Sequence, residues 1–474
     1  MTTSHYGPRP EPVSGQPISA ANPVPWRHAG VRHAVVLVLV LLAAMLVASV
    51  IGTLHHDTVS IYNLTGIVLL AVVGGLTYLV VWIYNRYQHD ARQRHLLLMV
   101  TTAALGCLLF LWLSVLSGLM TLVSLPAYLL ALPFTLAALW VLRRLQRNRK
   151  EPWKVMVFAI AWGLMVAPDL AMLSESVYST LLGSHLIPGV GAGVAQAISP
   201  GVFEEGAKGL AVVLLFLLFR DEFDDVVGGI VLGATVGLGF NFLETGGYMM
   251  MGFQEGGVAG LLLQLGYRQV LGLFLGHVTY TALIGAGIGV ARQQRVPWKK
   301  AVTFASGFVV AIAAHFLWDL VAMTGLAPSS DDPVVDTLVV TPLLYLAIDG
   351  PFALMVLVLL VRGLREEHSA LEVELQAEVQ TGLGAVTGRE LPVLLSPHRR
   401  LLSRWAALWR RGPRDYLWVL RLQDAQLALA MERWHRRRQE IDEPLEAEAH
   451  LRERALALKR HPPWPPARAT GTTG

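Results

Sequence analysis

The sequence predicts an all-α, polytopic membrane protein: a bundle of about ten transmembrane helices followed by a helical cytosolic tail. Three observations predict this class. Of the 474 residues, 54% are hydrophobic and only 15% are charged, with a mean hydropathy of +0.50, whereas soluble domains carry about 25% charged residues. Apolar runs of about 20 residues, enough to cross a hydrocarbon core of about 30 Å, recur along the chain. Lys and Arg gather in alternate loops between these runs.

Each apolar run predicts one spanning helix. In chain order we expect helices at residues 34–54, 64–84, 96–116, 119–142, 155–173, 202–219, 226–249, 266–290, 302–323 and 338–361. The first run is longer than the apolar region of about 7 to 15 residues in a signal peptide. We therefore expect it to be a retained helix.

The basic residues give an independent test of this count, because cytoplasmic loops are enriched in Lys and Arg. The densest group lies between the fourth and fifth runs and consists of Arg143, Arg144, Arg147, Arg149, Lys150 and Lys154. Every second loop is basic, and the intervening loops have almost no Lys or Arg. We therefore expect a multi-pass protein of the plasma membrane with both termini in the cytoplasm.

Charge and cysteine content exclude two other kinds of function. The net charge is +4, but most basic residues adjoin expected spans or lie in the tail, so topology explains them and no nucleic-acid partner is expected. The single cysteine, Cys107, lies inside an expected span. An intrachain disulfide and a cysteine-based metal or redox site are therefore excluded.

The chain divides into three regions by composition. Residues 1–30 are rich in Pro, Ser, Gly and Thr and predict a disordered cytoplasmic tail. Residues 31–365 form the expected transmembrane domain, and residues 366–474 predict amphipathic cytosolic helices with several Trp and Arg residues. Such helices either lie on an anionic leaflet or form the solvated faces of a small bundle. The sequence favours neither interpretation.

Ionisable side chains concentrate in the four expected helices between residues 202 and 323, although each costs about 2.5 to 3.5 kcal/mol at the centre of a span. They are Glu204, Glu205, Lys208, Glu244, His277, His315 and Asp319. With alternating helix directions and a rise of about 1.5 Å per residue, four of them reach a similar depth in the outer half of the membrane. A single shared site would explain this coincidence.

Two histidines and a glutamate are a common ligand set for a catalytic zinc ion, which lowers the pKa of a bound water. We expect Glu244, His277 and His315 to bind zinc. Glu204 or Glu205 would then act as the general base that takes a proton from the attacking water.

Lys208 and Asp319 are expected to support this chemistry. Lys208 shares a helix face with the two preceding glutamates and could hold one of them ionised, and Asp319 could accept the second N–H of His315. Each group also has a purely structural interpretation. The glutamates could stabilise a helix N-terminus and pair with Lys208, and His315 could simply bind Asp319.

These residues form ordered motifs on four successive expected helices: F-E-E-x-x-K at Phe203–Lys208, F-x-x-x-E at Phe240–Glu244, a lone histidine at His277, and H-x-x-x-D at His315–Asp319. The series resembles the PrsW family of bacterial intramembrane proteases. The related type II CAAX prenyl endopeptidases are similar in order but use E-E-x-x-x-R and F-x-x-x-H. Lys208 and Glu244 therefore favour PrsW.

The resemblance implies a protease core at about residues 155–323 that cleaves a membrane protein near its extracytoplasmic side, in the known case a single-pass anti-sigma factor. It implies functional roles for Glu204, Glu205, Lys208, Glu244, His277, His315 and Asp319. The CAAX-type enzymes suggest an alternative glutamate and histidine mechanism without metal. Two other classes stay open: a proton-coupled transporter, suggested by Asp169 and Asp349, and a non-catalytic membrane scaffold.

Overall fold

The computed structural model describes residues 82, 83, 86, 124–148, 150–181, 192–219, 225–324, 326–330, 332–437 and 446–463. Within these residues every regular element is a helix, which confirms the predicted all-α class. The N-terminal tail, Cys107 and nearly all of the first three expected spans lie outside the described residues.

The helices of the membrane region are α5 (Leu125–Leu145), α6 (Trp153–Met165), α7 (Ala167–Leu181), α8 (Ala192–Leu218), α9 (Val226–Gly266), the π-helix η1 (Tyr267–Leu271), α10 (His277–Gln293), α11 (Pro297–Met323), α12 (Pro333–Val335), the π-helix η2 (Asp336–Val340), α13 (Thr341–Ile348) and α14 (Gly350–Gln380). The tail adds α15 (Leu391–Leu394), α16 (Pro397–Arg411), α17 (Pro413–Arg437) and α18 (Glu446–Arg460).

Four stretches in the described residues are long and apolar enough to cross a membrane: Leu125–Leu145, Trp153–Met172, Val226–Leu271 and Pro297–Met323. A fifth span would be the pair that bends by 51° between Ile348 and Gly350. The prediction of about ten spans is therefore supported only in part. The orientation of the chain and the location of its tail stay predictions.

Two expected spans differ from the prediction for physical reasons. Helix α8 carries three charged residues at its centre, and this charge, not a low hydropathy, distinguishes it from the candidate spans. The run at 266–290 is not one helix: η1 ends at Leu271, residues 272–276 are not helical, and α10 has only 17 residues. At about 1.5 Å per residue, α10 is shorter than a hydrocarbon core.

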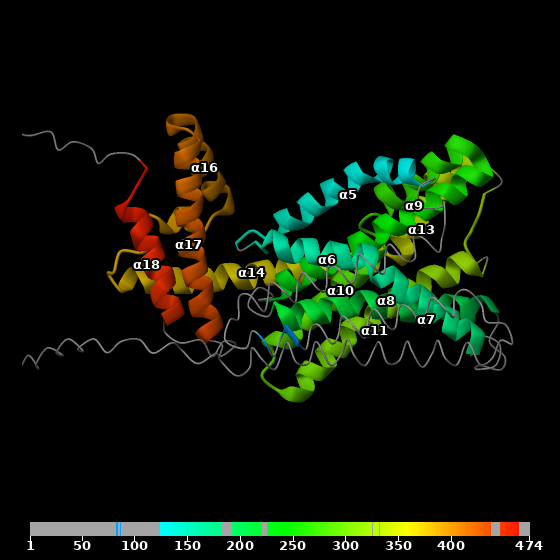
Figure 1. The fold of residues 1–474 in the computed structure, drawn as a ribbon, viewed down its shortest axis with the longest axis horizontal. Helices are drawn as coiled ribbons and strands as arrows, with labels where there is room; N and C mark the ends of the chain where they lie inside the picture. The colour runs from blue at the N-terminus through cyan, green and yellow to red at the C-terminus, as the bar shows by residue number, and fades with distance from the viewer. Residues whose placement is uncertain are drawn as a thin grey trace, which may run out of the picture.

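Helix α9 is the centre of the membrane bundle, and α5, α6 and α10 pack against it (Figure 1). Glycines on α9 bring α10 unusually close. A Cβ at Gly233 would lie 2.3 Å from the carbonyl oxygen of Thr281, and one at Gly237 would lie 2.2 Å from that of His277. Small residues permit such contact between membrane helices, and here they hold His277 against α9.

Helix α14 continues from the membrane bundle into the tail, where α16 and α17 run across its direction (Figure 1). Leu371 and Leu375 of α14 pack with Leu427 and Met431 of α17 in a core of their own. The expected helical tail is therefore a small folded bundle.

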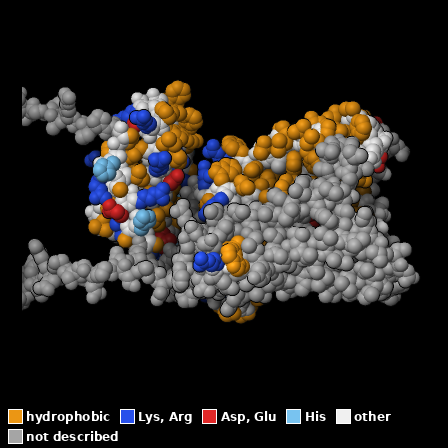
Figure 2. All heavy atoms as spheres, viewed as in Figure 1, with side chains coloured by type: hydrophobic (Ala, Val, Ile, Leu, Met, Phe, Trp, Pro, Cys, Tyr) orange, Lys and Arg blue, Asp and Glu red, His pale blue; other side chains and the backbone are white. Residues whose placement is uncertain are grey.

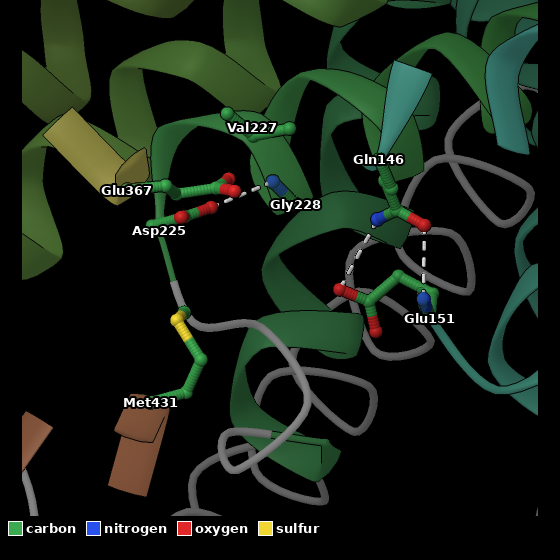
Figure 3. Close-up of a pocket in the computed structure, with 7 residues that line it drawn as sticks. All are labelled: Gln146, Glu151, Asp225, Val227, Gly228, Glu367 and Met431. Atoms are coloured by element: carbon green, nitrogen blue, oxygen red, sulfur yellow. Dashed lines mark hydrogen bonds between the residues drawn. The ribbon is translucent and has the colours of Figure 1, made fainter. Parts of the chain in front are cut away.

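A narrow pocket lies where this bundle meets the membrane helices (Figure 3). Its free space of about 10 Å³ holds about one water molecule. Asp225 accepts a hydrogen bond from the backbone N–H of Gly228, Glu151 binds Gln146, and Glu367 accepts one from Asn148. These carboxylates are thus part of the junction between the two bundles.

Candidate active site

The two motif glutamates lie in the middle of α8, not near its start. The helix already begins at Ala192, about 18 Å before Glu204 at 1.5 Å per residue. A helix dipole acts within the first turn, so it does not explain these carboxylates. The helix therefore begins ten residues before the expected span at residues 202–219.

Glu205 and Lys208 form a fully buried ion pair with 0% exposure for both side chains. The Nζ atom of Lys208 lies 2.6 Å from Glu205 Oε1 and 3.2 Å from Glu204 Oε2, and 4.1 Å from the centre of the Phe240 ring. Buried charges are tolerated only when they are paired. Lys208 therefore balances the charge of the buried Glu205 carboxylate and also contacts Glu204.

His277 is the first residue of α10, directly after the non-helical segment 272–276. Its Nδ1 atom lies 3.0 Å from Lys208 Nζ, and its Nε2 atom lies 2.5 Å from Glu244 Oε2. An ammonium group only donates hydrogen bonds, so Nδ1 accepts and the ring proton is on Nε2, which donates to Glu244. The lone pair of Nδ1 is therefore directed toward α8.

His315, on α11, is oriented in the same way by the second glutamate. Its Nδ1 atom donates to Glu205 Oε1 at 3.0 Å. In the neutral ring Nε2 then carries the lone pair, and this atom lies 3.9 Å from Glu204 Oε2 and 3.4 Å from Asp319 Oδ2. Asp319 thus lies on the side of the ring opposite to Glu205.

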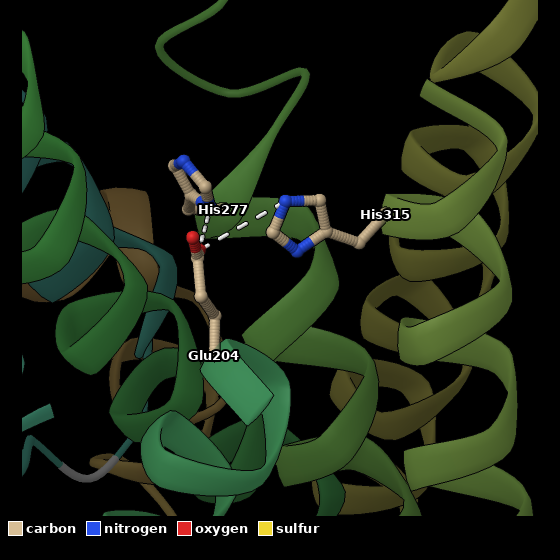
Figure 4. A group of neighbouring side chains, drawn as sticks. All are labelled: Glu204, His277 and His315. Atoms are coloured by element: carbon tan, nitrogen blue, oxygen red, sulfur yellow. Dashed lines mark ion pairs between the residues drawn. The ribbon is translucent and has the colours of Figure 1, made fainter. Parts of the chain in front are cut away.

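Three potential ligand atoms converge in the space between α8, α10 and α11 (Figure 4). Glu204 Oε2, His277 Nδ1 and His315 Nε2 all lie within 4.8 Å of one another. Glu204 Oε2 is 3.9 Å from each nitrogen, and a tetrahedral ion with bonds of about 2.0 to 2.1 Å spaces its ligands by about 3.3 Å. Each of these two contacts would therefore shorten by about 0.6 Å on metal binding.

Each imidazole in this group also donates its other N–H to a carboxylate. Metal-binding histidines almost always have such a partner, which fixes the ring and raises its basicity. Here the partners are Glu244 for His277 and Glu205 for His315. When His277 Nδ1 binds an ion, Lys208 keeps Glu205 Oε1 as its acceptor.

Glu244 differs from our sequence-based expectation in its position. The ligand group contains Glu204, whereas the Glu244 carboxylate lies on the far nitrogen of His277. The same Glu244 oxygen also binds Arg268, whose guanidinium lies 3.9 Å from the centre of the Tyr248 ring. The sequence signal for this partner was a single arginine inside an expected span.

Tyr280 and Asp349 are site residues that the sequence did not identify. The Tyr280 ring stacks on His315 at 5.2 Å and 25°, and its hydroxyl donates to Asp349 Oδ1 at 2.6 Å. Asp349 is fully buried at the bend between α13 and α14. Asp349, which suggested a transporter from the sequence, therefore positions the tyrosine ring that stacks on His315.

Glu175, on α7, is a further acidic residue near this site. Its carboxylate interacts electrostatically with Glu204 and His315, and its buried Oε1 atom has no hydrogen-bond partner among the described residues. It lies two residues beyond the expected span 155–173. Because the expected span ends at residue 173, the sequence did not predict Glu175 as a buried acidic residue.

Residues 151–347 match the family model of PrsW family intramembrane metalloproteases. The chain carries a PrsW family protease domain. The match contains all seven residues proposed from the sequence, and it extends from just before α6 to α13, so the tail bundle lies outside it. No curated protein and no solved structure matches the chain.

The match identifies residues 151–347 as a membrane-embedded protease domain, which implies a membrane protein as substrate and the lipid bilayer as its environment. The family description includes a metal ion, and the His and Glu group described above is a possible site for one. The apolar helices agree with a location in the membrane.

Proposed function

We propose that this PrsW-type protease hydrolyses a peptide bond with a zinc ion held by Glu204, His277 and His315. The observation that carries the proposal is that His277 Nδ1, His315 Nε2 and Glu204 Oε2 lie within 4.8 Å of one another, while a carboxylate accepts the proton of the opposite nitrogen of each imidazole. A zinc ion bound there would act as a Lewis acid toward the scissile carbonyl and lower the pKa of water.

The protein residues then divide the remaining tasks. Glu244 and Glu205 hold the two imidazoles, and Lys208 balances the charge of the buried glutamates. Asp319 has a buried Oδ2 atom on the ligand side of His315, and this atom has no hydrogen-bond partner among the described residues. We assign Asp319 the role of accepting the proton of the attacking water and passing it to the leaving amine.

This assignment revises the roles expected from the sequence for Glu244, for Glu204 and Glu205, and for Asp319, which was expected only to accept a hydrogen bond from His315. Glu244 becomes the partner of a ligand, because its Oε2 atom already binds both His277 and Arg268. Glu205 becomes a positioning residue, because it is fully buried, whereas the Glu204 side chain is 13% exposed. Glu204 is therefore the motif glutamate that is open to a metal ion or to water.

The metal content of the purified full-length protein tests the ligand set. We expect about one zinc per chain in the wild type, its loss in Glu204→Gln and His277→Ala, and a zinc affinity about 10- to 100-fold lower in Glu244→Gln. If Glu244→Gln abolishes zinc binding while Glu204→Gln retains it, the set Glu244, His277 and His315 is correct. A folded wild type without zinc would favour the glutamate and histidine mechanism without metal.

For the substrate we propose a single-pass membrane protein, similar to an anti-sigma factor, that is cut near its extracytoplasmic side. The resemblance to the PrsW family supports this choice. Profiling of protein N-termini in membranes that contain the wild type or His277→Ala tests it. We expect new N-termini beside the outer ends of single spans in the wild type only. New N-termini restricted to cytoplasmic segments would contradict the proposal.

A further inference from the structure

The tail helix α16 has an apolar face that the other described elements leave largely exposed, although Trp405 also contacts Tyr416 of α17. Leu402, Trp405 and Trp409 follow one another at a helical spacing of three and four residues, and their exposures are 53%, 45% and 82%. Trp409 is the most exposed large apolar side chain among the described residues. Residues at this spacing share one side of a helix, so they form a continuous apolar strip.

The start of α16 is attached to the loop that follows α5. Arg400 is 3% exposed and donates hydrogen bonds to the carbonyl oxygens of Leu394 and Arg147 and to Asn148 Oδ1, the last two at 2.8 and 3.0 Å. Arg147 lies two residues beyond the end of α5, which is one of the candidate spans. Helix α16 therefore begins at the level where α5 leaves the membrane.

Exposed tryptophans mark the same level on the membrane bundle. Each lies beside a basic residue at a helix end, as is typical of the membrane–water interface. The pairs are Trp140 with Arg144 at 5.0 Å, Trp153 with Arg143 at 4.3 Å and Trp298 with Lys299 at 5.7 Å. They belong to α5, α6 and α11.

The direction of α16 agrees with an interfacial position. Helices α16 and α17 run across the direction of α14, whose first part passes through the membrane bundle (Figure 1). Figure 2 shows hydrophobic side chains gathered on the edge of the tail bundle that faces the membrane helices. Hydrophobic side chains of the tail bundle thus lie on the side where α5 ends.

The charge of α16 identifies the kind of surface that it fits. The helix contains five arginines and no acidic residue. Arg399, Arg410 and Arg411 of α16 and the following Arg414 are exposed. A second copy packed on the same face would bring two arginine-rich helices together, which is unfavourable in an isologous interface. An anionic leaflet accepts both the apolar strip and its basic border.

We propose that α16 is an interfacial helix that binds the anionic leaflet next to the cytosolic end of α5. Leu402, Trp405 and Trp409 insert between the acyl chains and the headgroups, while the exposed arginines bind lipid phosphates; these are Arg399, Arg410, Arg411 and Arg414. The inserted helix would hold the whole tail bundle against the membrane surface. This role is independent of the peptidase site, since it involves residues outside the matched family domain.

The test measures the accessibility of one position on this face in the full-length protein. Cys107→Ser first removes the native thiol. Ala406→Cys then adds a thiol on the exposed side of α16 without removing a tryptophan. Glu453→Cys, at an exposed position of α18, is the matched control. The proteins are placed in nanodiscs of phosphatidylcholine alone or with 30% phosphatidylglycerol, and alkylation by a membrane-impermeant maleimide is timed.

We expect the anionic lipid to slow alkylation at position 406 at least about tenfold and to leave position 453 unchanged. High salt, or Arg410→Gln combined with Arg414→Gln, should remove most of this protection, because the basic border is screened or lost. Equal rates at position 406 in both lipids would overturn the proposal. Protection that persists in detergent and rises with protein concentration would assign the face to a second copy instead.

Discussion

Gly237→Ala should reduce the cleavage rate by moving His277 away from its partners. The new Cβ would lie 2.2 Å from the His277 carbonyl oxygen, and real Cβ atoms essentially never approach below 3.0 Å, so α9 and α10 must separate by about 0.8 Å there. The imidazole would move with this backbone and lose its contacts with Lys208 and Glu244 at 3.0 and 2.5 Å. A misplacement of about 1 Å can cost about 100-fold in rate.

The matched control is Gly247→Ala on the same helix. No atom lies within 4 Å of a Cβ at Gly247, and alanine stabilises a helix interior by about 0.5 to 1 kcal/mol relative to glycine. Both variants are assayed in nanodiscs on the substrate found by N-terminal profiling, with thermal unfolding measured in parallel. We expect a loss of about 10- to 100-fold for Gly237→Ala and wild-type activity for Gly247→Ala.

An overpacked helix contact also destabilises a protein, by about 1 to 3 kcal/mol, so the unfolding measurement separates the two effects. A folded Gly237→Ala protein that cleaves within about threefold of the wild-type rate would refute the reasoning. It would mean either that α10 adjusts without moving the imidazole, or that the position of His277 does not limit catalysis.

Three further predictions follow from the site and the tail. Tyr280→Phe keeps the ring on His315 but leaves buried Asp349 without the hydrogen bond that the tyrosine hydroxyl donates. The free energy of unfolding should therefore fall by about 1 to 3 kcal/mol, and cleavage should slow. An unchanged melting temperature would contradict this. Glu378→Gln weakens a network with Arg433 and Arg452, which keep Glu374 and Glu448 as partners, and should cost about 1 to 3 kcal/mol. We expect faster trypsin cleavage of the tail, unlike Glu453→Gln at an exposed pair. Dialysis against a zinc chelator should abolish cleavage, and added zinc should restore it. Full activity of the zinc-free protein would exclude a catalytic zinc ion.

Part of the candidate site follows from the sequence because hydrophobic length and motif order are one-dimensional properties. The four motifs predicted which helices carry polar groups and that these groups meet at one depth. In the structure Glu204, Glu205, His277 and His315 do meet. The family match at residues 151–347 confirms the protease assignment that was based on those motifs.

The break before α10 could not be read from hydropathy. Residues 272–276 have the composition of a span, yet they are not helical. Irregular backbone at membrane depth is tolerated where protein surrounds it or where it lines a cavity. Only the packing of α10 against the glycines of α9 decides that His277 starts a helix instead of lying within one.

The sequence by itself determined that the chain is helical, apolar and equipped with a buried set of Glu and His residues. Tertiary structure decided the partner of each residue. Glu204 and Glu205 are neighbours in the chain, but successive side chains on a helix point about 100° apart. Their different contacts, with a possible metal site and with His315, therefore depend on how α8 is rotated against α10 and α11. That rotation is set by side-chain packing between helices, which one helix's own sequence does not specify.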